Sequence, residues 1–327
     1  MKERLLYFDC SAGVAGDMVL AALIDLGLSL RELEAELARL RLRGFRLKAR
    51  GGERGGIRGI RLTVEAPGDA GGRPFAEFAR LIEKSRLGSA IKDRSLALLK
   101  RIYAAEARVH GMKPDQVHLH EIGSLDTLVD VVGTVQALDL LGISTCVASA
   151  VNVGGGDVRM EHGVVSAPAP ATVELLKGAP TFSDGSRFER TTPTGALLVT
   201  GLARFGPWPA MTVRAVGYGL GSKNPPVSKD GRPNALRVVL GEPAAGPAGT
   251  VLVLETTVDD ASPELLGYLL ERLLAGGALD VFFTPVSMKK NRPGVNVTVM
   301  AKPQEREALT AILFAESTTL GVRSYQA

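Results

Sequence analysis

Short apolar runs alternate with glycine-rich turns and amphipathic helical stretches along the chain. The apolar run at residues 5–8 predicts a strand, and a small-residue turn leads from it into a helix over residues 17–26 that Gly27 ends. An alternating stretch at residues 57–64 predicts another strand. Helical spacing of apolar residues recurs at residues 30–40, 76–109, from 125 onward, and 196–205. This order of elements is typical of an α/β fold.

The pattern changes after residues 242–249, a Gly-, Pro- and Ala-rich stretch in which no side chain can form a core. We therefore expect two domains, at residues 1–242 and 250–327. The second reads β-α-β-β-α, with strands at 250–257, 279–287 and 295–301 and helices at 263–275 and 304–315. This is one strand short of a ferredoxin-like split βαβ domain. We expect a truncated α+β domain, or one whose missing strand comes from a partner.

Composition narrows the class of protein. At 327 residues, with 45% hydrophobic and 23% charged residues, the chain fits a globular protein of about two domains. The first apolar run is too short for a signal peptide, and no window offers an uncharged membrane span. Only Cys10 and Cys146 are present, so a disulfide framework is excluded. We expect a cytoplasmic protein with no membrane partner.

The net charge of +4 favours anionic ligands only weakly. With one Trp and 5% aromatic residues, platforms for stacking nucleobases are scarce. Nucleic acid is therefore not an expected partner.

The histidines point to a metal. His118 and His120 lie two apart, so in an extended segment both imidazoles would point the same way and could hold one divalent ion. Glu121 adjoins them, and Asp126 and Asp130, four apart, share one face of the helix that follows. Two plainer readings stay open: one histidine packs while the other is exposed, and the aspartates form a hydrated helix face.

A second candidate lies at the first strand-to-helix turn. Asp9 and Cys10 end the strand and Asp17 begins the helix, so the turn could hold an anion or let the two aspartates share a cation. A tight turn with a buried cysteine is the alternative. The run at residues 217–221, Gly-Tyr-Gly-Leu-Gly, superficially suggests a dinucleotide fingerprint, but prolines follow where a helix should begin, so a Rossmann fold is excluded.

The third candidate lies in the last domain. Asp259 and Asp260 follow a strand and could bind Mg²⁺ or Mn²⁺, while Lys289, Lys290 and Arg292 at a hairpin could neutralise phosphates. This combination suits a nucleoside triphosphate without a Walker loop. The alternative is a solvated hairpin whose lysines protect a sheet edge.

Seven strings then resemble, in one order, the LarC family of nickel insertion proteins. They are FDCSAGVAGDM (8–18), HLHEIGSLDTLVDVVG (118–133), HGVVSAPAPATVELLKG (162–178), TTPTGA (191–196), TTVDDASPELLGY (256–268), MKKNRPG (288–294) and ESTTLGVR (316–323).

The resemblance implies a CTP-dependent cyclometallase of nickel-pincer cofactor biosynthesis. It would insert Ni²⁺ into pyridinium-3,5-bisthiocarboxylic acid mononucleotide, forming one Ni–C and two Ni–S bonds, while CTP is cleaved to CMP and pyrophosphate with the help of Mn²⁺ or Mg²⁺. A racemase or epimerase would receive the product, and a homo-oligomer is expected. Family members generally continue beyond the length seen here, which agrees with the expected truncation.

Carried onto this sequence, the resemblance and the residue chemistry together suggest three groups. Asp9, Cys10 and Asp17 form the catalytic group, and the CTP group is Lys289, Lys290, Asn291, Arg292, Glu316 and Thr318. The metal group is His118, His120, Glu121, Asp126 and Asp130 for nickel, with Asp259 and Asp260 for the ion that accompanies CTP. Two other functions remain open: a nickel metallochaperone that catalyses nothing, and a metal-dependent nucleotide phosphohydrolase.

Overall fold

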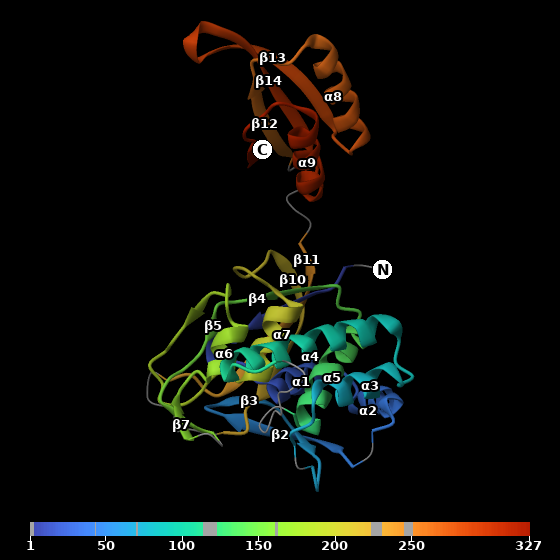
Figure 1. Cartoon of the computed structure of the whole chain (residues 1–327), viewed down its shortest axis with the longest axis vertical. Helices are drawn as coiled ribbons and strands as arrows, with labels where there is room; N and C mark the ends of the chain where they lie inside the picture. Colours follow the sequence, from blue (N-terminus) through green and yellow to red (C-terminus); the bar gives the residue numbers. More distant parts are fainter. Residues whose placement is uncertain are drawn as a thin grey trace. The chain divides into compact units, whose positions relative to one another are not determined.

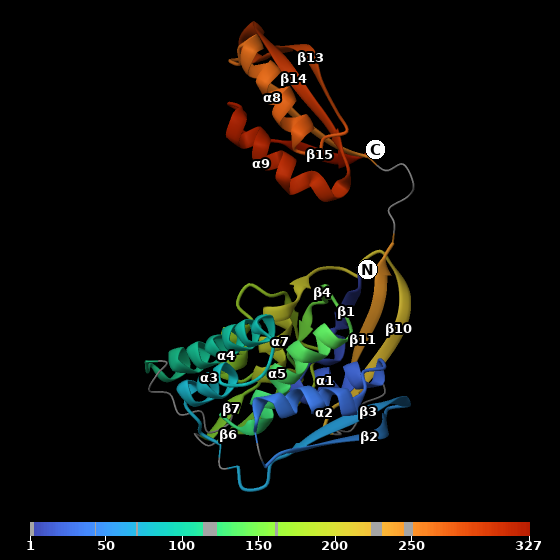
Figure 2. The same ribbon diagram turned by 90° about the vertical axis from the view of Figure 1, so that its right-hand side faces the viewer.

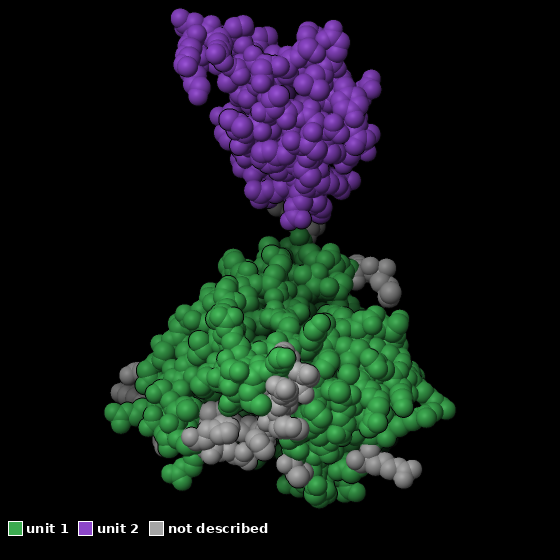
Figure 3. All heavy atoms as spheres, in the orientation of Figure 1, with its two compact units in different colours: residues 1–244 green, residues 245–327 purple. Residues whose placement is uncertain are grey.

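The computed structural model describes residues 3–42, 44–69, 71–113, 123–160, 163–223, 231–244 and 251–327. The chain divides into two compact units, residues 1–244 and residues 245–327, coloured separately in Figure 3. Within the described ranges, no helix has both the length and the apolar character needed to cross a membrane.

The first unit is built on a mixed seven-stranded sheet. Its order is β2-β3-β10-β11-β1-β4-β9, with β1 antiparallel to β11 and parallel to β4. The strands are β1 (Leu5–Asp9), β2 (Arg46–Arg54), β3 (Ile57–Glu65), β4 (Thr145–Ala148), β9 (Arg204–Phe205), β10 (Met211–Leu220) and β11 (Ala235–Pro243). Two small pairs, β5 (Val151–Asn152) with β8 (Thr181–Phe182) and β6 (Asp157–Met160) with β7 (Gly163–Ser166), lie outside it.

Helices gather on one side of this curved sheet, as Figures 1 and 2 show. They are α1 (Gly16–Asp25), α2 (Leu30–Leu37), α3 (Phe75–Glu83), α4 (Ser89–His110), α5 (Leu125–Leu140), α6 (Pro170–Leu175) and α7 (Pro193–Leu202), with short 3-10 turns at Cys10–Ala12 and Ala38–Leu40. The α/β class predicted from the sequence is confirmed.

Helix α1 lies at the centre of this unit, in contact with β3, β10, α5 and α7. Its side chains Leu20 and Leu23 are fully buried, and each contributes about 1.5–3 kcal/mol to stability. Two glycines of β10 let the helix backbone approach the strand: a Cβ at Gly219 would overlap the carbonyl oxygen of Met18, and one at Gly217 would overlap that of Ala22. The Gly-Tyr-Gly-Leu-Gly run thus serves helix–strand packing, which fixes the position of the α1 N-terminus.

The second unit has a four-stranded antiparallel sheet of order β13-β14-β12-β15. Its elements are β12 (Leu252–Val258), α8 (Pro263–Ala275), β13 (Asp280–Met288), a 3-10 turn (Lys289–Asn291), β14 (Arg292–Ala301), a second 3-10 turn (Pro303–Glu305), α9 (Arg306–Glu316) and β15 (Arg323–Gln326). The order of strands and helices is that of a ferredoxin-like split βαβ fold.

The expectation of a missing strand is therefore wrong. Residues 323–326 pair antiparallel with β12, with Arg323 opposite Glu255. The strand escaped the sequence pattern because it has only four residues, lies at the sheet edge and is largely polar, so it shows no apolar run. No partner strand is needed to build this sheet order.

Candidate functional site

The first unit contains a cavity of about 370 Å³ where three helices begin. Helices α1, α5 and α7 each contribute first-turn residues to its wall, and β3 forms another side. The lining residues are Ala15, Gly16, Asp17, Arg61, Leu62, Thr63, Val64, Asp126, Thr127, Asp130, Thr192, Pro193, Thr194 and Ser222.

Three carboxylates share this cavity: Asp17, Asp126 and Asp130. Asp126 and Asp130 lie one turn apart on α5, as their spacing predicted, whereas Asp17 reaches them from α1. Gly16 permits this approach, because a Cβ at that position would overlap Oδ2 of Asp130. The structure thus joins one residue of the predicted catalytic group to two of the predicted metal group.

The surroundings of Asp17 and Asp130 oppose the ionisation of these two carboxyl groups. Asp130 is 8% exposed, and its Oδ1 has no hydrogen-bond partner among the residues that the structure describes. Burial, followed by repulsion from Asp17 and Asp126, raises the pKa of Asp130 well above its usual value. Burial also raises the pKa of Asp17 to about 6, although the Met18 backbone N–H and the charge of Arg61 pull it down. A divalent cation in the cavity would offset this repulsion.

His118, His120 and Glu121 lie in residues 114–122, outside the described residues. Gly123 follows that segment directly, and only Ser124 lies between Gly123 and the first residue of α5, Leu125. Within the described ranges, no group of three or more His, Cys, Asp or Glu side chains is arranged to hold a metal ion. Their assignment to nickel therefore stays a prediction, and the three cavity carboxylates alone do not form a closed metal shell.

Asp9 and Cys10 lie apart from this cavity. Asp9 lines a different cavity of about 210 Å³ and accepts a hydrogen bond from Arg237 Nε at 3.0 Å. Burial alone would raise the pKa of Asp9, but the hydrogen bonds of Ser11 and Arg237 outweigh it and hold the pKa below its usual value. Cys10 is fully buried in the core, and burial raises its thiol pKa. A buried, protonated thiol is a poor nucleophile or metal ligand. The geometry therefore favours the alternative interpretation, in which residues 9–17 form a tight turn with a buried cysteine and no catalytic role.

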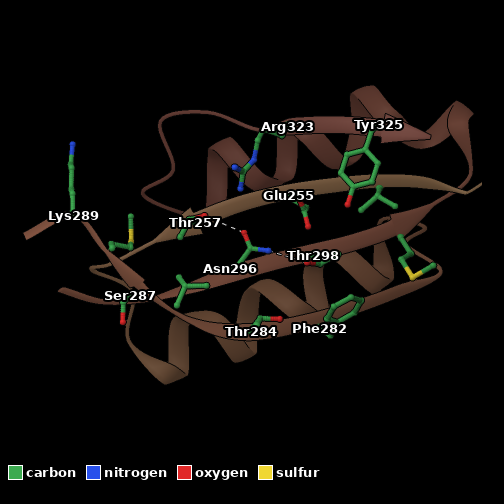
Figure 4. Close-up of a pocket in the computed structure, with 14 residues that line it drawn as sticks. Glu255, Thr257, Phe282, Thr284, Ser287, Lys289, Asn296, Thr298, Arg323 and Tyr325 are labelled. Atoms are coloured by element: carbon green, nitrogen blue, oxygen red, sulfur yellow. Dashed lines mark hydrogen bonds between the residues drawn. The ribbon is translucent and has the colours of Figure 1, made fainter. Parts of the chain in front are cut away.

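In the second unit, the sheet face opposite the helices is hollowed into a broad cavity of about 850 Å³, drawn in Figure 4. Its middle carries linked polar side chains: Thr257 Oγ1 donates to Asn296 Oδ1 at 3.1 Å, and Asn296 Nδ2 donates to Thr298 Oγ1 at 3.2 Å. The other lining residues are Val253, Glu255, Phe282, Thr284, Val286, Ser287, Met288, Lys289, Met300, Arg323 and Tyr325.

The two ends of this sheet face differ in chemistry. Phe282 and Tyr325, on the two edge strands, lie toward one end, and Lys289 lies at the other (Figure 4). Both aromatic rings are about half exposed, at 43% and 50%. The face therefore offers aromatic surface at one end, hydrogen-bonding groups in the middle and positive charge at the other end.

The predicted acidic pair lies at the cationic end, since Asp259 directly follows the last residue of β12 and β13 meets β14 there. Arg292 Nη1 donates to Asp259 Oδ2 at 3.3 Å, and Thr318 bonds to Asp260. Lys290 and Asn291 form the hairpin tip with left-handed backbone.

Glu316 faces a different neighbour from the other members of the predicted CTP group, because it pairs with Arg272 of α8 at 3.6 Å. The structure thus brings Asp259, Asp260, Arg292 and Thr318 together and leaves Glu316 engaged with a helix.

The sequence profile of one family, described as nickel insertion protein, matches residues 6–327. The chain belongs to this nickel insertion family. A protein of Geobacter sp. (strain M21) is 46% identical over 99% of this chain and 84% of its own length. One from Syntrophobacter fumaroxidans is 46% identical over 97% of this chain and 81% of its own length. Both bear the name "Putative nickel insertion protein".

One solved structure is also similar to part of this nickel insertion family member. It is described as LarC2, the C-terminal domain of a cyclometallase involved in the synthesis of the NPN cofactor of lactate racemase, in its apo form. The similarity has 44% identity, covers 24% of this chain and 54% of that one, and gives a TM-score of 0.24.

Sequence reasoning missed several cavity residues of this family member. Arg61 looked like one of many surface arginines on an alternating strand, and only tertiary packing brings it beside Asp17. Thr192 and Thr194 carried a readable signal, because Thr-Pro-x-Gly is a helix start in which Thr192 Oγ1 accepts from the Gly195 N–H at 3.3 Å. That signal marks a helix N-terminus and does not say what faces it.

Proposed function

We propose that this nickel insertion family member places Ni²⁺ into pyridinium-3,5-bisthiocarboxylic acid mononucleotide and consumes CTP as it does so. The observation that carries the proposal is the cluster of three carboxylates in a cavity of a family member, one of them with a buried oxygen that has no partner among the described residues. Nickel is a substrate of this reaction, and the three carboxylates would bind it before it is transferred to the organic substrate.

The oxygen donors of the three carboxylates suit a site that binds nickel only transiently. Carboxylate oxygens bind Ni²⁺ less tightly than imidazole or thiolate does, so sulfur atoms of a substrate could take the ion from them. His118, His120 and Glu121 would complete the shell, because only Gly123 and Ser124 separate their segment in sequence from α5. Replacing His118 and His120 by alanine should lower the bound nickel and leave CTP binding unchanged, as equilibrium dialysis against each ligand would measure. Undiminished nickel binding would remove the histidines from the shell.

Asp17 fits the role of base in this proposal. A ring carbon that gains a bond to nickel must lose its proton, and a base with a pKa near the working pH accepts protons most effectively. Burial raises the pKa of Asp17 to about 6 in the metal-free cavity, so Asp17 could accept this proton once the nickel has left its carboxylate for the substrate. Asp9 and Cys10 have no part in the proposed reaction, since they lie in another cavity and in the core.

The second unit would bind CTP on its hollowed sheet face. Either exposed ring, that of Phe282 or that of Tyr325, can stack on a base, and a side-chain amide and hydroxyls in the middle can bond to its edge. The triphosphate would then extend toward Lys289 and Arg292 at the cationic end.

The oxygen donors there also suit the hard cation that accompanies a triphosphate. Asp259, Asp260 and Thr318 offer carboxylate and hydroxyl oxygens, which Mg²⁺ and Mn²⁺ prefer. When bound, the ion would bridge phosphate oxygens and offset their charge.

Reconstitution tests the proposal. Purified protein receives Ni²⁺, Mn²⁺, CTP and the pincer precursor, and mass spectrometry follows the nickel-pincer product together with CMP. We expect both products from the wild type and from Asp93→Asn, an exposed aspartate of α4. Asp130→Asn should yield no nickel-pincer product.

The same assay separates the other two functions. Nickel binding without any CTP cleavage would support a metallochaperone and contradict the proposal. CTP cleavage that needs no precursor would support a phosphohydrolase.

A further inference from the structure

The smaller cavity beside Asp9, of about 210 Å³, has two arginines in its lining and belongs to neither proposed site. Arg237 of β11 is paired with Asp9 of β1 on one side and with Tyr218 of β10 on the other. Side chains of directly opposed residues in antiparallel strands point to the same face of a sheet. These three side chains therefore lie in one row, and Arg232 joins them from the segment just before β11.

Asp9 fixes the orientation of Arg237. Arg237 donates from Nε at 3.0 Å and from Nη2 to Oδ2 of Asp9, and the Ser11 N–H donates to Oδ1 at 3.1 Å. Burial would raise the pKa of Asp9, but these hydrogen bonds hold it low, so the carboxylate is charged and both of its oxygens have donors. The Tyr218 hydroxyl is a further partner of Arg237. A guanidinium has more N–H groups than these partners occupy, so Arg237 keeps donors for a ligand.

Arg232 carries the uncompensated charge in this lining. Its exposed side chain makes no ion pair or hydrogen bond with any residue that the structure describes. Its backbone is held in place, because Arg190 Nη1 donates to the Arg232 carbonyl oxygen at 2.9 Å. Burial lowers the pKa of Arg190, Asp184 raises it, and the charge of Arg232 lowers it again. An anion bound by Arg232 would relieve the repulsion between these two arginines.

The size and the remaining lining of the cavity indicate which anion fits. A volume of about 210 Å³ is several times the roughly 30 Å³ that one water molecule occupies in the liquid, so there is room for more than a bare oxyanion. The apolar lining residues are Ala12, Ile57, Pro233 and Ala235. One guanidinium fork matches a planar carboxylate, whereas a phosphate group has enough oxygens to accept from two guanidinium groups at once.

We propose that this cavity binds a small organic phosphate monoester, with the phosphate group between Arg232 and Arg237 and the carbon part against the apolar lining. Asp9 is a positioning residue that holds Arg237 for this contact. A sugar phosphate belongs to the ligand class that the cavity takes. The site is separate from the carboxylate cavity and from the sheet face of the second unit, so it stands or falls independently of the proposed function.

A single tryptophan reports on this cavity. Trp208 is the only tryptophan of the chain, and Cζ of Arg237 lies 5.7 Å from the centroid of its ring. Titration of the full chain with ribose 5-phosphate should therefore change the tryptophan fluorescence until the site saturates. Ribose, which lacks the phosphate, should cause no such change. Isothermal titration calorimetry with the same two compounds measures the affinity.

Substitution of Arg232 tests the contact itself. Arg232→Gln should weaken the binding of ribose 5-phosphate roughly 10-fold or more, because it removes a charge-assisted contact with the phosphate. The fold should be unaffected, since this side chain makes no contact of its own within the described residues. Arg232→Lys should keep part of the affinity, because it retains the charge without the planar fork. Arg31→Gln is the matched control: Arg31 is an exposed arginine of α2 outside all three cavities, so this variant should bind like the wild type.

Absence of ribose 5-phosphate binding in both measurements, or unchanged affinity in Arg232→Gln, would overturn the inference. Gluconate has a carboxylate in place of the phosphate, and its binding as tightly as ribose 5-phosphate would contradict the choice of a phosphate group. Affinity lost in Lys289→Ala with Arg292→Ala, and kept in Arg232→Gln, would place the phosphate in the second unit and reject this site.

Discussion

The carboxylate cavity of the first unit and the sheet-face cavity of the second differ in how their polar side chains are compensated. In the first unit, Asp17 and Asp130 lie where burial and the repulsion of neighbouring carboxylates disfavour their charge, and Asp130 keeps an oxygen without a partner among the described residues. The sheet face of the second unit is open, and its Thr257, Asn296 and Thr298 side chains satisfy one another. Under the proposed function, this difference suits the first site to a cation and the second to a polar ligand.

The largest expected effect tests the proposed CTP site on the sheet face of the second unit. Lys289→Ala with Arg292→Ala removes positive charge from the hairpin, and CTP binding should weaken by about 1.5–3 kcal/mol for each charge-assisted hydrogen bond that the substitutions remove. Calorimetric titration with Mn²⁺ and CTP measures this. Nickel binding should stay at the wild-type level, because the carboxylate cavity belongs to the other unit. Unaltered CTP affinity would mean that the phosphates bind elsewhere.

A smaller effect tests the close approach of α1 and α5 at the carboxylate cavity of the first unit. Gly16→Ala introduces a Cβ that overlaps Oδ2 of Asp130, so thermal denaturation should show a decrease in stability of about 1–3 kcal/mol, and the bound nickel should decrease.

Gly267→Ala is the control for this change. Gly267 lies within α8 with open space around it, so alanine should stabilise that helix by up to about 1 kcal/mol. A Gly16→Ala protein as stable as the wild type would show that α1 and α5 do not approach so closely.

The smallest effect is a pH dependence. The pKa of Asp17 rises from 3.8 to about 6 on folding, so between these values the folded state binds more protons than the unfolded state. The free energy of unfolding then falls as pH rises through this window. Asp17→Asn should therefore gain stability over the wild type, from nothing near pH 4 to on the order of 1–2 kcal/mol above pH 6.

Urea denaturation at several pH values, without metal, checks this dependence. A difference that does not change between pH 4 and 7 would contradict the raised pKa.

Local signals predicted much of the fold. Ser262 and Pro263 start α8, and the predicted bounds of that helix agree with the structure. Strands β10 and β11 were not predicted, because their place depends on pairing with residues far along the chain. The glycines of β10 were noticed, but only the packing of α1 against them explains their presence.

In the candidate site, too, local spacing predicted some neighbours, whereas tertiary packing decided the others. Asp126 and Asp130 could be placed together from their spacing, since both belong to one helix. That Asp17 joins them while Asp9 and Cys10 do not depends on where α1 begins relative to α5. Arg61 reaches the cavity only through the sheet, so no local pattern could have assigned it.

The most direct test of the account is a nickel titration of Asp130→Asn. Removing a metal-binding carboxylate should cost at least as much as removing an outer partner, so nickel affinity should fall roughly 100-fold. Equilibrium dialysis with metal analysis compares this variant with the wild type and with Asp93→Asn, which should match the wild type. Wild-type nickel affinity in Asp130→Asn would contradict the claim that this carboxylate cavity holds the metal.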